Sequence, residues 1–170
     1  ADFDGDGDLD LFVGQRLAPS IFRNDGDWRF VDATDAWGAT HETDGIIYTP
    51  AYFDATGDGA PDLYLPVDVD VVAFRIDEPP PLDPPGDRLL VTHRAADGAH
   101  RFVDEAAARG LGGARSGMGV VLADFNDDER LDVYLSNIGA NPLFLARGDG
   151  TFESSVAHEA IANTWALRHE

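Results

Sequence analysis

The chain begins with ADFDGDGDLDLFV, in which an aspartate stands at every second position from Asp2 to Asp10. Carboxylates this close together repel one another and resist ionisation unless a cation lies among them. Carboxylate and carbonyl oxygens are the ligands that calcium prefers, and the ion takes six to eight of them at about 2.3–2.6 Å. The spacing therefore predicts a tightly curled loop that binds Ca²⁺ through alternate side chains.

The same pattern occurs twice more, as FDATGDGAPDLYL from Phe53 and as ADFNDDERLDVYL from Ala123. Aligned on the last aspartate, the copies carry side-chain oxygens at loop positions 1, 3, 5 and 9, and a backbone carbonyl at position 7 is a further expected ligand. The sequence predicts up to three calcium ions. The predicted ligands are Asp2, Asp4, Asp6, Asp8 and Asp10 in the first copy, Asp54, Thr56, Asp58, Ala60 and Asp62 in the second, and Asp124, Asn126, Asp128, Arg130 and Asp132 in the third.

The three copies differ at positions that matter for this chemistry. Gly7 and Gly59 stand at position 6, where a sharp bend is needed, whereas the third copy has Glu129 there, which is expected to distort its loop. Thr56 replaces an acidic residue in the second copy, so that copy is expected to bind calcium most weakly. An EF-hand also begins D-x-D-x-D-G but needs glutamate at position 12 between two helices. Position 12 here is apolar and lies in a strand-like run, which excludes an EF-hand.

Each loop stands in the same local sequence. An apolar segment precedes the second and third loops, LDLFV, PDLYL or LDVYL follows, and then comes an apolar hairpin with Asp25-Gly26, Asp97-Gly98 or Asp149-Gly150 at its turn. The pattern predicts an all-β fold of β-propeller blades, each with four antiparallel strands and with its calcium loop between the first and second strands. Three tryptophans and three phenylalanines are assigned to the core by their spacing: Trp28, Trp37, Trp165, Phe30, Phe102 and Phe152.

The repeats divide the chain into one propeller or a portion of one, residues 1–170. The expected units are about 1–45, 46–115 and 116–163, with 164–170 forming a strand that completes the first or the next blade. Residues 68–87 hold five prolines within seven positions, and this segment is expected to be an insertion loop, since proline interrupts a central strand. Three repeats are few for a propeller, so either the chain belongs to a longer propeller or copies associate as a homo-oligomer.

The D-x-D-x-D-G-x-x-D loop followed by D-L-[FY]-[VL], with N-x-G-D-G-x-F-like turns downstream, resembles the FG-GAP/VCBS repeats of integrin α-subunit propellers. It is most similar to the bacterial and cartilage-acidic-protein-like members. The resemblance covers nearly all of the chain except the proline-rich insertion. It implies a calcium-binding β-propeller, usually extracellular, in which the ions brace the blades and the loops contact partners.

Composition limits the remaining possibilities. The 170 residues carry a net charge of −20 and no lysine, which disfavours binding to nucleic acid, and no apolar run is long enough to insert into a membrane. Cysteine is absent, which excludes disulfides and thiolate chemistry. Because the chain starts at Ala1, its true N-terminus is expected to have been processed or cut away. We expect an extracellular or cell-surface protein, with the periplasm as a further option.

The sequence predicts a non-enzymatic scaffold for adhesion or for recognition of a protein or glycan ligand. The five histidines show no metal-ligand spacing, and no nucleophile or phosphate-loop motif occurs. Two alternatives stay open: the chain is a propeller portion of a larger polysaccharide-active enzyme, or it is a lectin.

Overall fold

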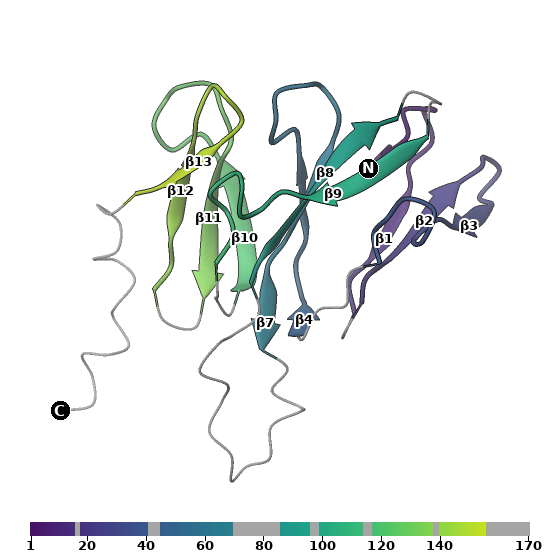
Figure 1. Ribbon diagram of the computed structural model, residues 1–170, viewed down its shortest axis with the longest axis horizontal. Helices are drawn as coiled ribbons and strands as arrows, with labels where there is room; N and C mark the ends of the chain where they lie inside the picture. Colours follow the sequence, from purple (N-terminus) through teal and green to yellow (C-terminus); the bar gives the residue numbers. More distant parts are fainter. Residues whose placement is uncertain are drawn as a thin grey trace, which may run out of the picture.

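The computed structural model describes residues 1–15, 18–40, 45–69, 86–95, 99–113, 117–137 and 140–155. Every regular element in these ranges is a β-strand, and all strand pairs are antiparallel. The all-β prediction is therefore confirmed. Figure 1 shows three sheets side by side, which within the described residues do not close into a ring.

The three main sheets follow the order of the repeats. The first sheet has β1 (Leu11–Val13), β2 (Ser20–Asn24) and β3 (Phe30–Asp32). The second has β5 (Ala51–Phe53), β6 (Asp62–Leu65), β8 (Arg88–Arg94) and β9 (His100–Asp104). The third has β10 (Gly117–Ala123), β11 (Asp132–Asn137), β12 (Leu143–Ala146) and β13 (Phe152–Ser154). Four antiparallel strands per unit, with the acidic loop between the first two, are thus observed in the second and third sheets.

A small fourth sheet was not predicted. β4 (Gly45–Ile47) pairs with β7 (Val67–Val69), apart from the second sheet. The apolar segment before the second loop was expected to be a single strand, but it is divided into β4 and β5. Pro50 lies in the break, and proline has no N–H to continue a ladder. β7 also occupies the start of the predicted insertion. Residues 70–85 of the insertion and the predicted strand at 164–170 lie outside the described residues.

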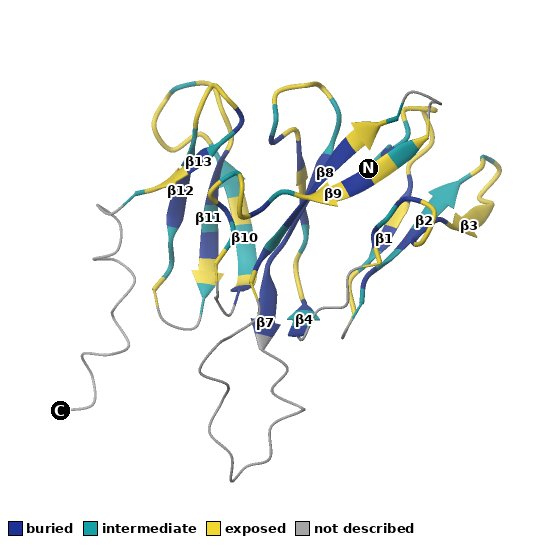
Figure 2. Cartoon of the chain, viewed as in Figure 1, coloured by how far each residue is buried: buried dark blue, intermediate teal, exposed yellow. Residues whose placement is uncertain are grey.

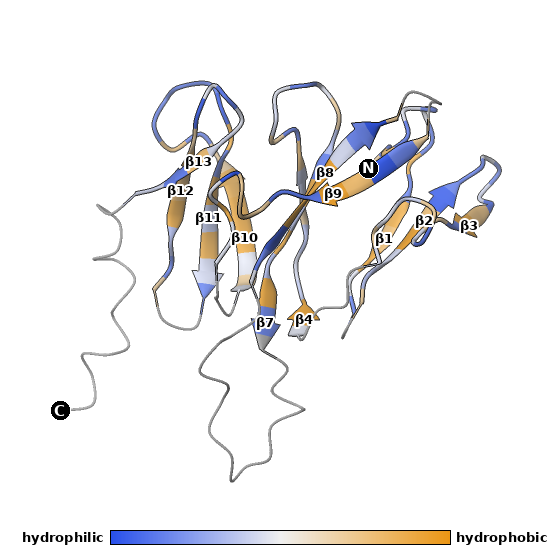
Figure 3. Ribbon diagram, in the orientation of Figure 1, coloured by the Kyte–Doolittle hydropathy of each residue, from blue (hydrophilic) through white to orange (hydrophobic). Residues whose placement is uncertain are grey.

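The core consists of two apolar layers, each between neighbouring sheets (Figures 2 and 3). Between the first and second sheets, Phe3 packs edge-on against Phe102, with ring centroids 5.3 Å apart, and Trp37 lies beside both. Between the second and third sheets, Phe53 and Phe152 make a similar edge contact at 6.2 Å. The alternation of side chains along each strand gives the second sheet one apolar face for each layer.

Two of the aromatic residues assigned to the core are on the surface. Trp28 is 86% exposed and Phe30 is 39% exposed, whereas Trp37, Phe102 and Phe152 are buried as predicted. Trp165 is outside the described residues. Trp28 lies in the β2–β3 turn, where Asp27 and Trp28 both have left-handed φ angles of 49° and 60°. Trp28 is therefore exposed at this turn and does not pack in the core.

The predicted positions of the hairpin turns are confirmed only in part. Gly150 has a φ of 74°, and its N–H donates to the carbonyl of Arg147, so the predicted Asp149-Gly150 turn is confirmed. In the first sheet the turn is centred after the Asp25-Gly26 pair, with the N–H of Arg29 donating to the carbonyl of Gly26. The Asp97-Gly98 turn lies outside the described residues.

Neighbouring sheets are also joined through their backbones. A short turn after β3 presents the carbonyl of Trp37 to the N–H of Phe102 at 2.7 Å. The equivalent turn after β9 presents the carbonyl of Arg109 to the N–H of Phe152 at 2.8 Å. Gly110 is required there because a Cβ would lie 2.3 Å from the carbonyl oxygen of Phe152. The same contact therefore fixes each sheet to the next.

Candidate metal centre

The three acidic loops are loop 1 (residues 2–10), which precedes β1, loop 2 (54–62), which joins β5 to β6, and loop 3 (124–132), which joins β10 to β11. In each loop the aspartate at position 1 accepts backbone hydrogen bonds from the loop itself. Asp54, for example, accepts from the N–H groups of Gly57 at 2.7 Å and Gly59 at 2.8 Å. Asp2 does the same for Gly5 and Gly7. The first carboxylate thus curls the chain around itself.

The aspartate at position 9 holds each loop to its sheet. One oxygen of Asp132 accepts from the N–H of Phe125 at 2.9 Å, and the other accepts from the N–H of Ala146 on β12 at 2.8 Å. Asp10 and Asp62 make the same pair of bonds. All three aspartates are buried. Since a carboxylate has about four acceptor sites, these bonds leave each group able to bind a cation as well.

Positions 4 and 6 of every loop have left-handed backbone conformations. Loops 1 and 2 place glycine at both positions, but loop 3 places Asp127 and Glu129 there, with φ angles of 60° and 67°. The expectation that Glu129 would distort loop 3 is wrong in this respect, because the backbone follows the same path. A non-glycine residue in this region carries a conformational cost of about 1–2 kcal/mol.

Loop 1 brings its carboxylates closest together. Asp2, Asp4 and Asp10 each offer one carboxylate oxygen within 4.8 Å of the others. No other three acidic or histidine side chains among the described residues come this close. Partial burial, and next the carboxylate of Asp10, raise the pKa of Asp4 above its ordinary value. Asp6 is not in this group, and its side chain accepts from the N–H of Asp8 at 2.9 Å. The predicted carbonyl ligand at position 7 is on Asp8.

Loop 2 has less negative charge. Thr56 lies at position 3, and its hydroxyl is 3.4 Å from the carboxylate of Asp54. Burial raises the pKa of Asp62 to about 6, in spite of the two backbone N–H groups that bind it. Asp58 accepts from the N–H of Ala60, the predicted carbonyl ligand, as the position-5 residue does in the other loops.

Loop 3 contains a positive charge of its own. The guanidinium of Arg130 lies 2.7 Å from Asp128 in an ion pair, and the amide of Asn126 donates to the same carboxylate oxygen at 2.9 Å. Hydrogen bonds from the backbone, led by that of Glu129, lower the pKa of Asp124. The position-5 carboxylate that a cation would use is therefore already paired.

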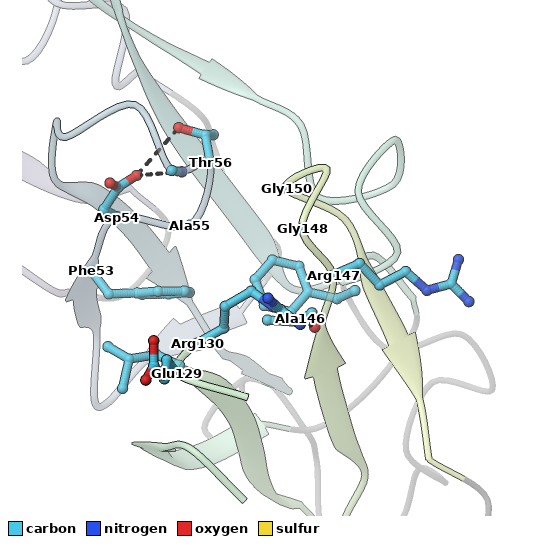
Figure 4. Close-up of a pocket in the computed structure, with 13 residues that line it drawn as sticks. Phe53, Asp54, Ala55, Thr56, Glu129, Arg130, Ala146, Arg147, Gly148 and Gly150 are labelled. Carbon is cyan, nitrogen blue, oxygen red and sulfur yellow. Dashed lines mark hydrogen bonds between the residues drawn. The ribbon is translucent and has the colours of Figure 1, made fainter. Parts of the chain in front are cut away.

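Loops 1 and 2 each contact the sheet that follows. Arg94 at the end of β8 donates to the carbonyl of Asp4 at 3.0 Å. Loop 2 lies against the β12–β13 turn, where a Cβ on Gly150 would be 3.2 Å from the carbonyl oxygen of Thr56. A pocket of about 310 Å³ opens beside this contact, between Asp54 and Thr56 on one side and Arg130 and Arg147 on the other (Figure 4). Anything that fixes these loops therefore also affects the contact between sheets.

Sequence reasoning identified the loop residues but missed two further groups. Arg94 and Arg109 both connect neighbouring sheets, since Arg109 donates to the carbonyl of Gly150 at 2.8 Å and pairs with Glu105 at 2.7 Å. Partial burial raises the pKa of Glu105, but the hydrogen bonds from His93 and Arg109 outweigh it, and the net pKa is lowered. The similar segments RFVDATDAWG and RFVDEAAARG could have indicated that the turns after β3 and β9 are equivalent.

One family model matches part of the chain. Residues 2–65 match the family model described as an FG-GAP-like repeat. The match ends at the last residue of β6, so it takes in loops 1 and 2 but not loop 3. This part of the chain therefore carries an FG-GAP-like repeat, as the sequence analysis predicted. No curated protein matches the chain. The part of the chain that the structure describes contains no helix with the length and apolarity of a membrane span.

Proposed function

We propose that the chain is a calcium-stabilised scaffold of β-propeller type, whose sheets are blades braced by ions in the acidic loops. One observation carries the proposal: a carboxylate oxygen from each of Asp2, Asp4 and Asp10 lies within 4.8 Å of the other two. Oxygen ligands at this spacing suit a hard cation such as calcium. The FG-GAP-like match over the same residues supports the same assignment.

The proposed role of calcium is structural. Loops 1 and 2 touch the next sheet through Asp4 and Thr56, so an ion that orders a loop also orders that contact. The ions would also offset part of the net charge of −20, which opposes compaction through self-repulsion. Binding to the native state alone adds about 2.7 kcal/mol per site when free calcium exceeds Kd a hundredfold.

We further propose that this scaffold is non-enzymatic and acts outside the cytoplasm. Calcium concentrations there suit modules with dissociation constants of about 10⁻⁴–10⁻³ M. The clustered carboxylates of the loops accept backbone hydrogen bonds, which supports a structural role rather than acid–base chemistry. The ligand proposed for the scaffold is a protein or a glycan.

The calcium proposal is tested with an Asp4→Asn variant in loop 1. Within the loop the carboxylate of Asp4 accepts a hydrogen bond from the N–H of Asp6 at 3.2 Å, whereas Asp2 and Asp10 accept the bonds that shape the loop, so the substitution leaves that frame intact. Thr56→Ala at the same position of loop 2 is the matched control. Titration calorimetry should show a loss of about tenfold or more in the tightest calcium affinity for Asp4→Asn and little change for Thr56→Ala.

Thermal unfolding of the unmodified chain provides the independent readout. Chelation with EDTA should lower Tm, and added calcium should restore it, with magnesium in place of calcium as the specificity control. An unchanged Tm after the ions have been removed, verified by elemental analysis, counts against a stabilising role. Equal loss of affinity in the two variants contradicts the assignment of the tightest site to loop 1.

Glycan recognition is favoured by one observation, the exposed indole of Trp28. Trp28 is 86% exposed at the β2–β3 turn, and an exposed indole can stack on a sugar ring. A glycan array with the unmodified chain and Trp28→Ala separates this possibility from protein binding. Binding that is unaffected by the substitution assigns the ligand to another surface.

A further inference from the structure

The two layers between sheets are built from the same positions. On the face of the second sheet that contacts the first, Leu63 and Leu90 are register partners and Phe102 lies farther along the same face. The corresponding residues of the third sheet, facing the second, are Val133, Phe144 and Phe152. All six are nearly fully buried, at 6% exposure or less. We call this set of positions the rear face of a sheet.

The first sheet has a rear face of the same composition, but nothing among the described residues buries it to this extent. By strand register its members are Leu11, its partner Phe22, and Phe30. Leu11 is 46% exposed, Phe30 is 39% exposed and Phe22 is partly buried. The opposite face, with Phe12 and Ile21, is buried against the second sheet. Phe30 is therefore exposed because no described sheet lies against the rear face of the first sheet.

We call the opposite face of each sheet, which in the first two sheets packs against the following sheet, its front face. On the third sheet, Phe125 and Val121 of this face are exposed. Loop position 2 carries Phe3 in loop 1 and Ala55 in loop 2, both buried in the layer formed with the next sheet. The equivalent residue of loop 3, Phe125, is 48% exposed. It lies against Tyr134, with ring centroids 6.4 Å apart, and Val121, the register partner of Tyr134, is 54% exposed.

We propose that a second copy of this chain docks on these faces, with the rear face of the first sheet of one copy against the front face of the third sheet of the other. The proposed contact continues the two apolar layers inside the chain. The same register positions that meet between the first and second sheets, and between the second and third, are apolar at both ends of the stack. Single exposed apolar residues are ordinary, but two sets that complement each other by repeat position form an interaction surface.

The proposed contact is heterologous, because each copy contributes a different surface. If two copies of three sheets each satisfy both ends, the result is a closed ring of six sheets without an open rear or front face. The inference rests on the packing of the sheets and not on calcium binding, so either proposal can fail without the other. Because both copies are strongly acidic, screening of the repulsion by salt should strengthen the association.

The test is the mass of the unmodified chain in solution, measured by light scattering over micromolar to millimolar concentrations in calcium and in EDTA. We expect a species of twice the 18.3 kDa chain mass whose fraction rises with protein concentration and with salt. Phe30→Asp damages the rear face and Phe125→Asp the front face. Each alone should shift the dimer–monomer equilibrium at least tenfold toward monomer. Trp28→Asp, at an exposed aromatic on the turn, is the control and should leave the mass unchanged.

Mixing the two variants distinguishes this arrangement from any other dimer. Phe30→Asp retains an intact front face and Phe125→Asp an intact rear face, so a mixed pair has one intact contact and one that carries both substitutions. An equimolar mixture should therefore regain dimers that neither variant forms alone, in a smaller fraction than the unmodified chain. Circular dichroism verifies that each variant is folded. A monomeric mass for the unmodified chain at all concentrations overturns the proposal, and so does a mixture of folded variants that remains monomeric.

Discussion

Loop 1 and loop 3 share the hydrogen bonds made by positions 1, 5 and 9, but they neutralise their charge differently. In loop 1 the carboxylates of Asp2, Asp4 and Asp10 converge. In loop 3 the carboxylate of Asp128 pairs with Arg130. Both loops nevertheless follow the same backbone path, with left-handed residues at positions 4 and 6.

This difference separates two roles that the sequence motif combines. The aspartates at positions 1 and 9 shape the loop by accepting backbone N–H groups, and they do so in all three copies. Position 5 is aspartate in all three loops, but the residues at positions 3 and 7 vary, and they determine whether an ion or an arginine supplies the positive charge. A loop can therefore keep its shape while its capacity for calcium changes.

The largest expected effect comes from removing the aspartate at position 9, which holds every loop to its sheet. Asp132→Ala removes the acceptor of two backbone N–H groups, on Phe125 and Ala146, and an unsatisfied buried donor costs about 1–3 kcal/mol. We expect a loss of about 3 kcal/mol or more in the free energy of unfolding. Urea denaturation in EDTA, which removes any contribution of bound ions, measures it.

Asp128→Ala is the control within the same loop. It removes the ion pair with Arg130 and the hydrogen bonds from Asn126 and the N–H of Arg130, all at the surface of the loop, where an ion pair contributes about 0–1 kcal/mol. Its loss of stability should be well below that of Asp132→Ala. Equal losses in the two variants contradict the view that position 9 holds the loop to its sheet.

Much of this loop architecture was predictable because the spacing of aspartates carries it directly. Alternate oxygens, the following D-L-[FY]-[VL] strand and the Asp149-Gly150 turn depend on local sequence alone. The surface position of Phe30 depends instead on which sheet lies opposite. Phe30 and Phe102 occupy the same position of their repeats, and only the neighbouring sheet makes one exposed and the other buried.

The candidate site shows the same limit. The sequence predicts that Asp124, Asp128 and Asp132 are ligands, but it does not show that the side chain of Arg130 turns back onto Asp128. That residue was expected to contribute only its carbonyl. The structural role of position 9 was also hidden, because the bond from Asp62 to the N–H of Thr92 joins residues 30 positions apart.

Removal of the internal cation of loop 3 should bring its calcium affinity closer to that of loop 1. Arg130→Ala removes the guanidinium from the carboxylate of Asp128, which keeps its bond from Asn126, and it removes a positive charge that repels calcium. The affinity of loop 3 should rise roughly tenfold, which corresponds to about 1.4 kcal/mol. Calorimetric titration in an Asp4→Asn background, where loop 1 is weakened, isolates this change.

Arg147→Ala is the matched control for that experiment. Arg147 is also exposed and lies on the neighbouring turn, but it pairs with Glu153 rather than with a loop carboxylate. Its removal changes net charge by the same amount and should leave the affinity of loop 3 nearly unchanged. A similar gain in both variants would show that overall charge, and not the pair with Asp128, limits binding.

The smallest expected effect concerns the backbone that the loops have in common. Glu129 has a φ of 67° at the position where loop 1 has Gly7 with a φ of 97°. Glu129→Gly should stabilise the protein by about 0.5–1 kcal/mol, because relief of the left-handed strain exceeds the entropic cost of glycine in the unfolded chain. Gly7→Ala should cost a comparable amount. No atom lies within 4 Å of a Cβ placed there, so its cost reflects the backbone alone. Chemical denaturation in EDTA compares the two variants, and a loss of stability in Glu129→Gly would mean that the glutamate side chain contributes more to loop 3 than its strained backbone costs.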